Sequence, residues 1–258
     1  MNRIHGKIVI ITGATAGIGR ACAHTLADKG ARIVLIARRE ARLGALAEEI
    51  RENSDTSVHT HVLDVRDRAG VGRFMDFLET EQLLPDVLIN NAGLARGLSP
   101  VQSGSHEDWD EMIDTNVKGV LNMTRSVLPG MIARDSGQIV NIGSIAGHIV
   151  YPNGNVYNAT KFAVKALTEA TNIDLIGTKV RVSSVDPGLV ETEFSLVRFR
   201  GDSERAEKVY HGVDSLLPED IADAVAYVVN TPDHVNVLDM VVLPTVQRSP
   251  YVMARDAD

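Results

Sequence analysis

The stretch at residues 7–29 reads KIVIITGATAGIGRACAHTLADK and places a glycine-rich turn between two segments of different periodicity. Residues 7–12 are apolar and rich in β-branched side chains, which predicts a buried strand. Residues 18–29 show helical periodicity up to Gly30, which predicts a helix that ends at this glycine. The stretch therefore predicts a strand, a tight turn and a helix in immediate succession.

The same alternation of strand and helix continues along the rest of the chain. Apolar runs predict further strands at 32–37, 57–63, 86–89, 137–142, 179–185 and 237–243. Helical periodicity predicts helices at 40–52, 67–80, 106–134, 155–176 and 218–231. Strands that are apolar throughout and alternate with helices indicate a parallel sheet covered on both faces. Right-handed crossovers then give a doubly wound, Rossmann-type α/β fold.

The length and composition favour a single domain over residues 1–258. The chain is 44% hydrophobic and 23% charged, so it can bury a substantial core. No composition shift marks a second domain. The segment 189–217 has poor periodicity and several charges, and it lies between a predicted strand and a predicted helix. In folds of this kind such a segment is typical of a loop that covers the substrate.

Charge and cysteine content exclude several classes of protein. The net charge is -8 and no block of Lys or Arg occurs, so we expect no nucleic-acid partner. No apolar run approaches the ~20 residues that cross a bilayer, so we expect no membrane partner. Cys22 is the only cysteine and the N-terminal stretch does not resemble a signal peptide, which favours the cytoplasm. His59 and His61 share a strand face without a third ligand nearby, so we expect no metal site.

The glycine-rich turn is suited to binding a dinucleotide. Gly13 permits a tight turn, Gly17 allows backbone amides to approach a pyrophosphate, and Gly19 allows close packing of the helix on the strand. The turn residues expected to bind the cofactor are Gly13, Thr15, Ala16, Gly17, Ile18 and Gly19. The spacing is GxxxGxG and not the commoner GxGxxG, so a turn that only joins the two elements is the alternative.

Two arginines follow the second predicted strand. An acidic residue at this point would bind the ribose hydroxyls of NAD, whereas Arg38 and Arg39 match a 2'-phosphate in charge and geometry. The expected cofactor is therefore NADP(H). The alternative is that both arginines are solvated, with Arg39 paired to a nearby glutamate.

Polar residues also follow the third and fourth predicted strands. Asp64 and Val65 follow one, and Asn91, Ala92 and Gly93 follow the other. The carboxyl ends of parallel strands form the edge where ligands bind in open sheets, so we expect all five residues at the cofactor. As alternatives, Asp64 could cap the next helix and the asparagine stretch could be an ordinary turn.

Ser144, Tyr157 and Lys161 form the candidate catalytic group. Tyr157 and Lys161 are four residues apart on a predicted helix, so their side chains share one face. We expect the nearby ammonium to lower the pKa of the phenol, which would make Tyr157 an acid and base. Ser144 would hydrogen-bond the substrate oxygen, and Lys161 would also hold the nicotinamide ribose. Taken alone, such a Tyr and Lys pair is more often structural.

Together, the segments TGATAGIG and NNAG, Ser144, and the segment YNATK resemble the short-chain dehydrogenase/reductase family over essentially the whole chain. The resemblance implies an NADP-dependent oxidoreductase that assembles as a homotetramer. It implies that Asn116 holds a water that relays protons to Lys161, whereas such an asparagine taken alone is more often an interior helix residue with its own hydrogen bonds. It also implies that residues after the sixth strand bind the nicotinamide side, namely Pro187, Gly188, Val190 and Thr192. A non-catalytic NADP-binding sensor is the alternative, which the presence of all four catalytic residues disfavours.

The segments 112–134, 187–202 and 234–247 are similar to a group of NADP-dependent 3-hydroxy acid dehydrogenases that also oxidise serine and L-allo-threonine. Sulfoacetaldehyde reductases resemble the same group. The resemblance implies a small anionic substrate, either a carboxylate or a sulfonate, which requires a cation. Arg198 is the candidate for this cation and Arg200 is the reserve, with surface positions as the alternative for both. We expect the stretch after Ser144 to line the pocket, with His148 and Tyr151 as candidates to hydrogen-bond the substrate. The alternative for His148 is a residue at the rim, which is more common for a lone histidine.

Overall fold

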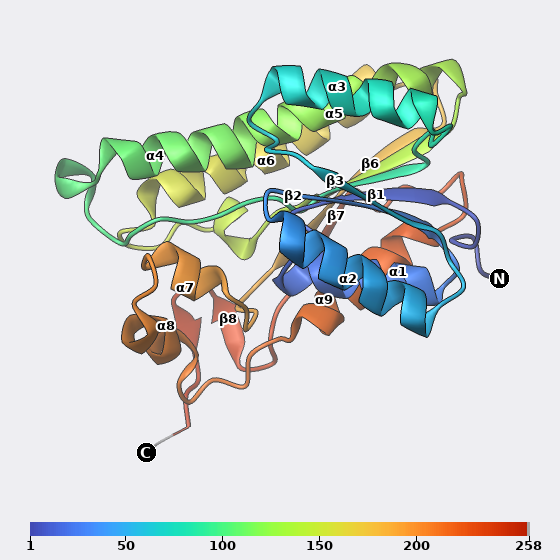
Figure 1. Cartoon of the computed structure of the whole chain (residues 1–258). Coiled ribbons are helices and arrows are strands. Elements are labelled where there is room, and N and C mark those ends of the chain that lie inside the picture. The colour runs from blue at the N-terminus through green and yellow to red at the C-terminus, as the bar shows by residue number, and fades with distance from the viewer. Residues whose placement is uncertain (257–258) are drawn as a thin grey trace.

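Seven parallel strands form the centre of the molecule, which we describe from a computed structural model that covers residues 1–256 (Figure 1). The strands lie in the order β3-β2-β1-β4-β5-β6-β7. Their bounds are β1 Ile8–Thr12, β2 Arg32–Ala37, β3 Val58–Val62, β4 Val87–Asn90, β5 Gly137–Ile142, β6 Val180–Pro187 and β7 Asp239–Val242. The order reverses between β1 and β4, which creates the crevice at the carboxyl ends of the strands where open α/β sheets bind ligands. The predicted fold class is confirmed.

Helices cover both faces of this sheet. One face is covered by α1 (Gly17–Asp28), α2 (Glu40–Asn53) and α9 (Pro218–Val229), whose apolar residues share a core with the strands. The other face carries α3 (Arg68–Thr80), α5 (Val120–Ala133) and α6 (Asn155–Asp174) (Figure 1). The structure describes no helix within residues 1–256 that is long and apolar enough to cross a membrane.

The first strand shows why the predicted strands are apolar throughout. Ile8 and Ile10 belong to the core on the side of α3 and α5, whereas Val9 and Ile11 belong to the core on the side of α1 and α9. Because successive side chains of a strand point to opposite faces, a sheet covered on both faces needs an apolar residue at every position.

Hydrogen bonds join the end of β1 to the segment after β4 at the crevice. The Thr12 Oγ1 atom accepts hydrogen bonds from the backbone amides of Asn91 and Ala92, both at 3.0 Å. The Asn91 Nδ2 atom donates in return to the Thr12 carbonyl at 2.9 Å. The glycine-rich turn and the segment after β4 are therefore held together by hydrogen bonds before any ligand is considered.

The predicted helix at 106–134 is interrupted. It consists of α4 (His106–Ile113), a π-helical segment η2 (Asp114–Gly119) and α5. A wider turn here brings Asn116 under the segment after β4, where its Nδ2 and Oδ1 atoms bond the Leu94 carbonyl and amide, both at 2.8 Å. Single turns of π-helix are frequent at functional sites.

The C-terminal part contains elements that the sequence did not predict. Two short helices, α7 (Phe194–Arg198) and α8 (Ser203–Tyr210), occupy part of the predicted loop at 189–217. After β7, a small hairpin is formed by β8 (Gln247–Ser249) and β9 (Val252–Met253). In Figure 1 these elements lie together at the end of the sheet where the crevice opens.

Candidate active site

A cavity of about 590 Å³ occupies the crevice at the carboxyl ends of the strands. Most of the residues predicted for the site line it, namely Gly13, Thr15, Ala16, Gly17, Ile18, Arg38, Arg39, Asp64, Val65, Asn91, Ala92, Gly93, Ser144, Tyr151, Tyr157, Lys161, Pro187, Gly188, Val190, Thr192 and Arg198. Four predicted residues are absent from its lining: Gly19, Asn116, His148 and Arg200.

The glycine-rich turn forms one end of the cavity, and its Gly13 and Gly19 have no room for a side chain. Gly13 has a φ of +64°, and a Cβ there would lie 2.9 Å from the Ala92 Cα atom. At Gly19, which lies behind the cavity wall, a Cβ would overlap the Asn91 amide and the Gly13 carbonyl. Since α1 begins at Gly17, its free amides face the cavity, and helix N-termini of this kind bind phosphates. The turn therefore fits the pyrophosphate of a dinucleotide.

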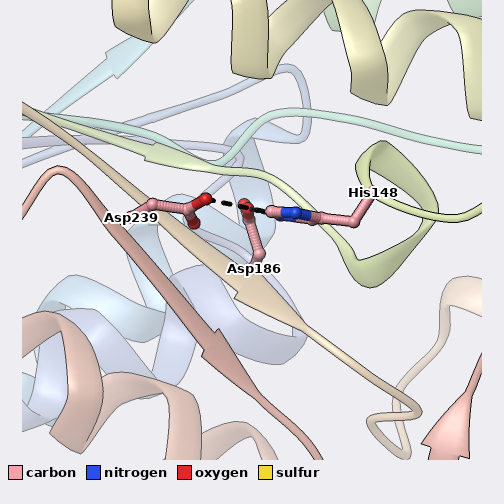
Figure 2. A group of neighbouring side chains, drawn as sticks. All are labelled: His148, Asp186 and Asp239. Carbon is pink, nitrogen blue, oxygen red and sulfur yellow. Dashed lines mark hydrogen bonds and ion pairs between the residues drawn. The ribbon is translucent and has the colours of Figure 1, made fainter.

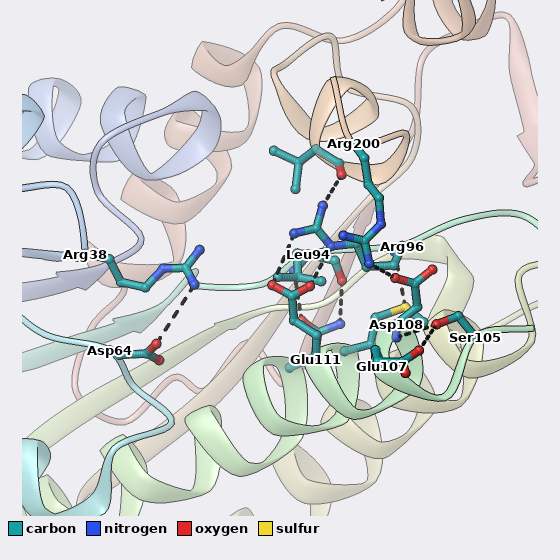
Figure 3. A network of polar contacts seen from close by, with 12 residues as sticks. Arg38, Asp64, Leu94, Arg96, Ser105, Glu107, Asp108, Glu111 and Arg200 are labelled. Atoms are coloured by element: carbon teal, nitrogen blue, oxygen red, sulfur yellow. Dashed lines mark hydrogen bonds and ion pairs between the residues drawn. The ribbon is translucent and has the colours of Figure 1, made fainter. Parts of the chain in front are cut away.

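The two predicted phosphate-binding arginines lie at the same end of the cavity. The Arg38 Nη1 atom lies 3.9 Å from the Asp64 carboxylate, as Figure 3 shows. The Arg39 Nη2 atom donates to Thr15 Oγ1 at 3.0 Å, and its Nη1 atom lies 3.5 Å from the Glu193 carboxylate. Both guanidinium groups are about half exposed, so they can reach a 2'-phosphate at the cavity edge.

Ser144, Tyr157 and Lys161 meet at the opposite end of the cavity. Ser144 lies two residues after the end of β5, and its Oγ atom accepts a hydrogen bond from the Ala146 amide at 3.1 Å. Tyr157 and Lys161 project from α6, with the Lys161 Nζ atom 5.8 Å from the centre of the Tyr157 ring. The Lys161 ammonium donates to the Ile142 carbonyl at the end of β5, at 2.8 Å. The helix and the strand end thus fix the lysine beside the tyrosine.

The pKa of Tyr157 shifts in the direction opposite to the prediction. Burial raises the pKa of the phenol above its ordinary value, and the positive charge of Arg198 and a hydrogen bond with Ser144 lower it by smaller amounts. The cation that lowers the pKa of Tyr157 is therefore Arg198 and not Lys161. Burial also lowers the pKa of Lys161 to about 8. A phenol that keeps its proton is in the form that can donate to a substrate oxygen.

Arg198 lines the cavity beside Tyr157. Its Nη2 atom donates to the Tyr151 hydroxyl at 2.6 Å, and its guanidinium carbon lies 5.1 Å from the centre of the Tyr157 ring. The Nε atom is buried and has no hydrogen-bond partner within residues 1–256. A buried donor without a partner is costly, and an anionic ligand would satisfy it.

Arg200, the reserve candidate, lies outside the cavity. Its side chain is 61% exposed and pairs with Asp108 of α4 (Figure 3). The hypothesis of a surface arginine is therefore correct for Arg200, whereas Arg198 is the cation that the structure places beside Tyr157.

His148 does not line the cavity, which corrects its predicted contact with substrate. Its Nε2 atom lies 2.5 Å from the buried Asp186 carboxylate, and Asp239 is 3.7 Å away (Figure 2). Its Nδ1 atom faces the Lys165 ammonium at 3.1 Å. The three acid and base groups lie within 4.8 Å of one another, and the Lys165 ammonium, 3.9 Å from Asp239, supplies positive charge beside them.

Asn116 is buried, and its side chain makes three hydrogen bonds. Besides its two bonds to Leu94, the Nδ2 atom donates to Thr160 Oγ1 at 3.1 Å. The side chain therefore joins η2 to α6 and to the segment after β4. The predicted water relay stays a prediction.

Sequence reasoning missed three contributors to the site. Phe194 packs edge-on against Tyr157 with the ring centres 5.6 Å apart, and Glu193 pairs with both Arg39 and Arg42. Asp186 lies behind Lys161, where its charge raises the pKa of the lysine. Asp186 directly precedes the Pro187-Gly188 pair, which was the available sequence signal.

The turn, the paired arginines and the Ser, Tyr and Lys group define a nucleotide-dependent oxidoreductase. The family model described as short chain dehydrogenase matches residues 7–201, which is most of the chain. The chain therefore belongs to the short-chain dehydrogenase/reductase family, and it is an NADP(H)-dependent enzyme.

Two relatives and one solved structure are similar to the chain over nearly its whole length. The chain is 48% identical over 241 residues to the NADP-dependent 3-hydroxy acid dehydrogenase YdfG of Salmonella typhi, covering 93% of this chain and 96% of the relative. It is 45% identical over 251 residues to sulfoacetaldehyde reductase 2 of Chromohalobacter salexigens, covering 96% and 99%. A closed form of serine dehydrogenase complexed with NADP+ superposes with a TM-score of 0.91 at 43% identity, covering 97% of this chain and 100% of that one.

Proposed function

We propose that the protein interconverts a small hydroxy acid and its carbonyl form, with NADP(H) as the redox partner. The observation that carries the proposal is Arg198, a half-buried cation with an unpaired Nε donor beside the Tyr157 phenol. The names of the relatives agree with this proposal, since they act on 3-hydroxy acids, serine and sulfoacetaldehyde. A small acid or a sulfonate offers planar or trigonal oxygens that a guanidinium binds through two donors.

The reduction needs one hydride and one proton. NADPH supplies the hydride to the carbonyl carbon when it is bound in the cavity. The Ser144 hydroxyl holds the carbonyl oxygen, and the Tyr157 phenol donates its proton to that oxygen as negative charge develops on it. Oxidation of the hydroxy acid is the reverse, in which the phenolate takes the hydroxyl proton. Because burial raises the pKa of Tyr157, the apo site favours the proton-donating form.

Lys161 has two tasks in this proposal. Its ammonium lies near the Tyr157 ring and is held by the Ile142 carbonyl, so it is positioned to bond the nicotinamide ribose. It would also return a proton to Tyr157 after each turnover, through the water predicted at Asn116. These tasks concern the proton and the cofactor, and neither selects the substrate.

The choice of substrate is assigned to Arg198 and Tyr151. The Tyr151 hydroxyl fixes one end of the guanidinium, and the free Nε atom remains for an anion. Carboxylate and sulfonate have the same charge, so malonic semialdehyde and sulfoacetaldehyde are both candidate substrates. A sulfoacetaldehyde reductase is therefore the second candidate function, supported by the same guanidinium and by the 45% identical relative.

The test is a comparison of three aldehydes at saturating NADPH. Malonic semialdehyde, sulfoacetaldehyde and uncharged propanal are compared in the wild type, in Arg198→Ala and in Arg200→Ala. We expect both anions to exceed propanal, and Arg198→Ala to lower kcat/KM for the anions by about 10- to 100-fold, as expected for loss of a charged hydrogen bond. Propanal should lose much less than the anions, because it offers no charged group to Arg198, and Arg200→Ala should behave like the wild type.

The outcomes separate the competing functions. The anion with the higher kcat/KM in the wild type identifies whether a carboxylate or a sulfonate is preferred. Propanal as the best substrate, or an equal loss for all three aldehydes in Arg198→Ala, would contradict the role of Arg198. NADPH binding without turnover of any hydroxy acid or aldehyde would instead favour a non-catalytic sensor.

A further inference from the structure

We propose that Arg96 and Glu111 form a positioning pair that holds Arg198 over the substrate and so sets the preference for anionic substrates. This inference rests on the proposed function of Arg198. Neither residue of the pair lines the cavity, so the effect on substrate passes through α7. The evidence is a chain of contacts that runs from the segment after β4 to the last turn of α7.

The pair itself is an ion pair with two hydrogen bonds. The Arg96 Nε atom donates to Glu111 Oε2 at 2.7 Å, and its Nη2 atom donates to Glu111 Oε1 at 3.1 Å. The two side chains are only 15% and 21% exposed. A two-pronged guanidinium pair with so little exposure has a defined geometry, unlike an ordinary surface ion pair. Glu111 lies on α4, so the pair fastens Arg96 to a helix (Figure 3).

The third donor of Arg96 reaches α7. The Arg96 Nη1 atom donates to the Val197 carbonyl, and the Gly97 amide donates to the Arg198 carbonyl at 3.0 Å. Two consecutive carbonyls at the end of α7 are therefore bound by two consecutive residues of the segment after β4. Since Arg198 is the last residue of α7, these bonds fix the main chain from which its guanidinium extends.

Helix α7 needs such support because it is only five residues long. A helix of this length has no stability of its own. Its start is held by the Ser195 Oγ bond to the Tyr210 hydroxyl at 2.9 Å and by exposed pairs of Glu193 with Arg39 and Arg42. At its end, the main-chain bonds from outside the 189–217 segment, within residues 1–256, are those from Arg96 and Gly97.

The positive charge of Arg96 is balanced by the negative charge of Glu111. Its hydrogen bonds with Glu111 are the main reason that the pKa of this carboxyl is lowered. The pair is therefore close to neutral as seen from Arg198. Its effect on the substrate comes from geometry, because a displacement of about 1 Å at a binding group can change turnover by about 100-fold.

The experiment uses Arg96→Leu, which removes both the ion pair and the bond to Val197. We measure kcat and KM for the preferred anionic aldehyde and for propanal, the Kd of NADPH, and the melting temperature. We expect KM for the anion to rise by about 10- to 100-fold with a smaller fall in kcat. Values for propanal and NADPH should stay at those of the wild type. Arg96→Lys keeps the charge and should restore part of the affinity for the anion.

A double-mutant cycle distinguishes positioning from a general structural role. If Arg96 acts through Arg198, then Arg96→Leu combined with Arg198→Ala should lose no more activity on the anion than Arg198→Ala alone. Arg200→Ala is the matched control, because it breaks an exposed pair with Asp108 close to the same end of α7. Glu111→Gln replaces Arg96→Leu if the latter does not fold. We expect the same result for it, namely a higher KM for the anion and unchanged values for propanal.

Two results would overturn the inference. The first is an equal loss for the anion and for propanal, and the second is a double variant in which the two losses simply add. The failure of the proposed function has a different signature, because Arg198→Ala would then retain the wild-type preference for anions. An effect of Arg198→Ala without any effect of Arg96→Leu would reject the positioning pair alone.

Discussion

Tyr157 lies between two cations, which affect it in different ways. Arg198 lies over its ring at 5.1 Å and lowers the pKa of the phenol, whereas Lys161 lies 5.8 Å from the ring centre and is fastened to the Ile142 carbonyl. The cation proposed to bind substrate thus also lowers the pKa of the proposed acid. A bound anion would neutralise Arg198 and let the pKa of Tyr157 rise further, which keeps the phenol protonated for transfer to a carbonyl oxygen.

Replacement of Tyr157 by phenylalanine removes the proton donor and keeps the ring. Loss of a general acid lowers kcat by about 10²- to 10⁴-fold. The Phe194 contact depends on the ring, so the pocket should persist and the Kd of NADPH, measured by fluorescence titration, should change little. Turnover equal to that of the wild type would reject the role of Tyr157 as the proton donor.

The pH dependence of the reaction should report Lys161. Burial lowers the pKa of Lys161 to about 8, so the side chain is cationic below that pH and neutral above it. Reduction of the carbonyl should therefore slow as the pH rises through about 8. The charge of Asp186 raises the pKa of Lys161, so Asp186→Asn lowers it further and should move the alkaline limb of kcat/KM to lower pH.

The matched control for this experiment is Asp239→Asn. Asp239 contacts His148 and Lys165 in the same cluster, but it is not among the groups that shift the pKa of Lys161 (Figure 2). Its variant should keep the alkaline limb of the wild type. An alkaline limb at the same pH in Asp186→Asn and the wild type would show that Asp186 does not act on Lys161.

Local spacing explains which site residues could be predicted. Tyr157 and Lys161 are fixed to one face by helix geometry, and Ser144 is brought to them because β5 and α6 are neighbours in the sequence. His148 could not be placed in this way, since its orientation depends on Asp186, 38 residues further along the chain. The pKa of Tyr157 was wrongly predicted for a similar reason, because burial and the distance to Arg198 are properties of the folded chain.

At the scale of elements, the predicted strand ends lie within two residues of the strand ends in the structure. Strands β2 and β5 have the predicted bounds, because apolar runs buried on both faces end where the sheet ends. The π-helical segment η2 was missed because its cause is tertiary, namely the bonds between Asn116 and Leu94. The hairpin of β8 and β9 has little apolar periodicity, and its buried Gln247 is held by polar bonds.

Gly19 of α1 and Gly44 of α2 should respond differently to replacement by alanine. A Cβ at Gly19 of α1 would overlap Asn91 and the Gly13 carbonyl, so Gly19→Ala should destabilise the protein by about 1–3 kcal/mol and weaken NADPH binding. A Cβ at Gly44 of α2 would meet nothing within 4 Å, so Gly44→Ala should stabilise by about 0.5–1 kcal/mol with unchanged NADPH binding. Denaturant unfolding and cofactor titration measure both effects. Equal effects of the two substitutions would contradict the close packing at the turn.

At the scale of the whole molecule, the helices on one side of the sheet expose apolar side chains. Leu121 and Ile132 of α5 are 43% and 46% exposed, and Phe162 and Ile173 of α6 are 40% and 72% exposed. These helices bury one face against the sheet, so the exposed residues form a second apolar face on the same elements. Such a face is typical of packing between subunits.

We therefore expect a homotetramer in which α5 and α6 contribute to a subunit interface. Sedimentation velocity of the wild type should give a tetramer, and a monomer would refute the prediction. An arginine in the centre of an apolar interface must be desolvated without a partner, so Leu121→Arg and Phe162→Arg should each yield smaller species. Val101→Arg is the matched control, because Val101 is 60% exposed but lies in the short 3-10 helix Val101–Ser103, outside α5 and α6. If all three variants sediment like a tetrameric wild type, the interface must lie elsewhere on the molecule.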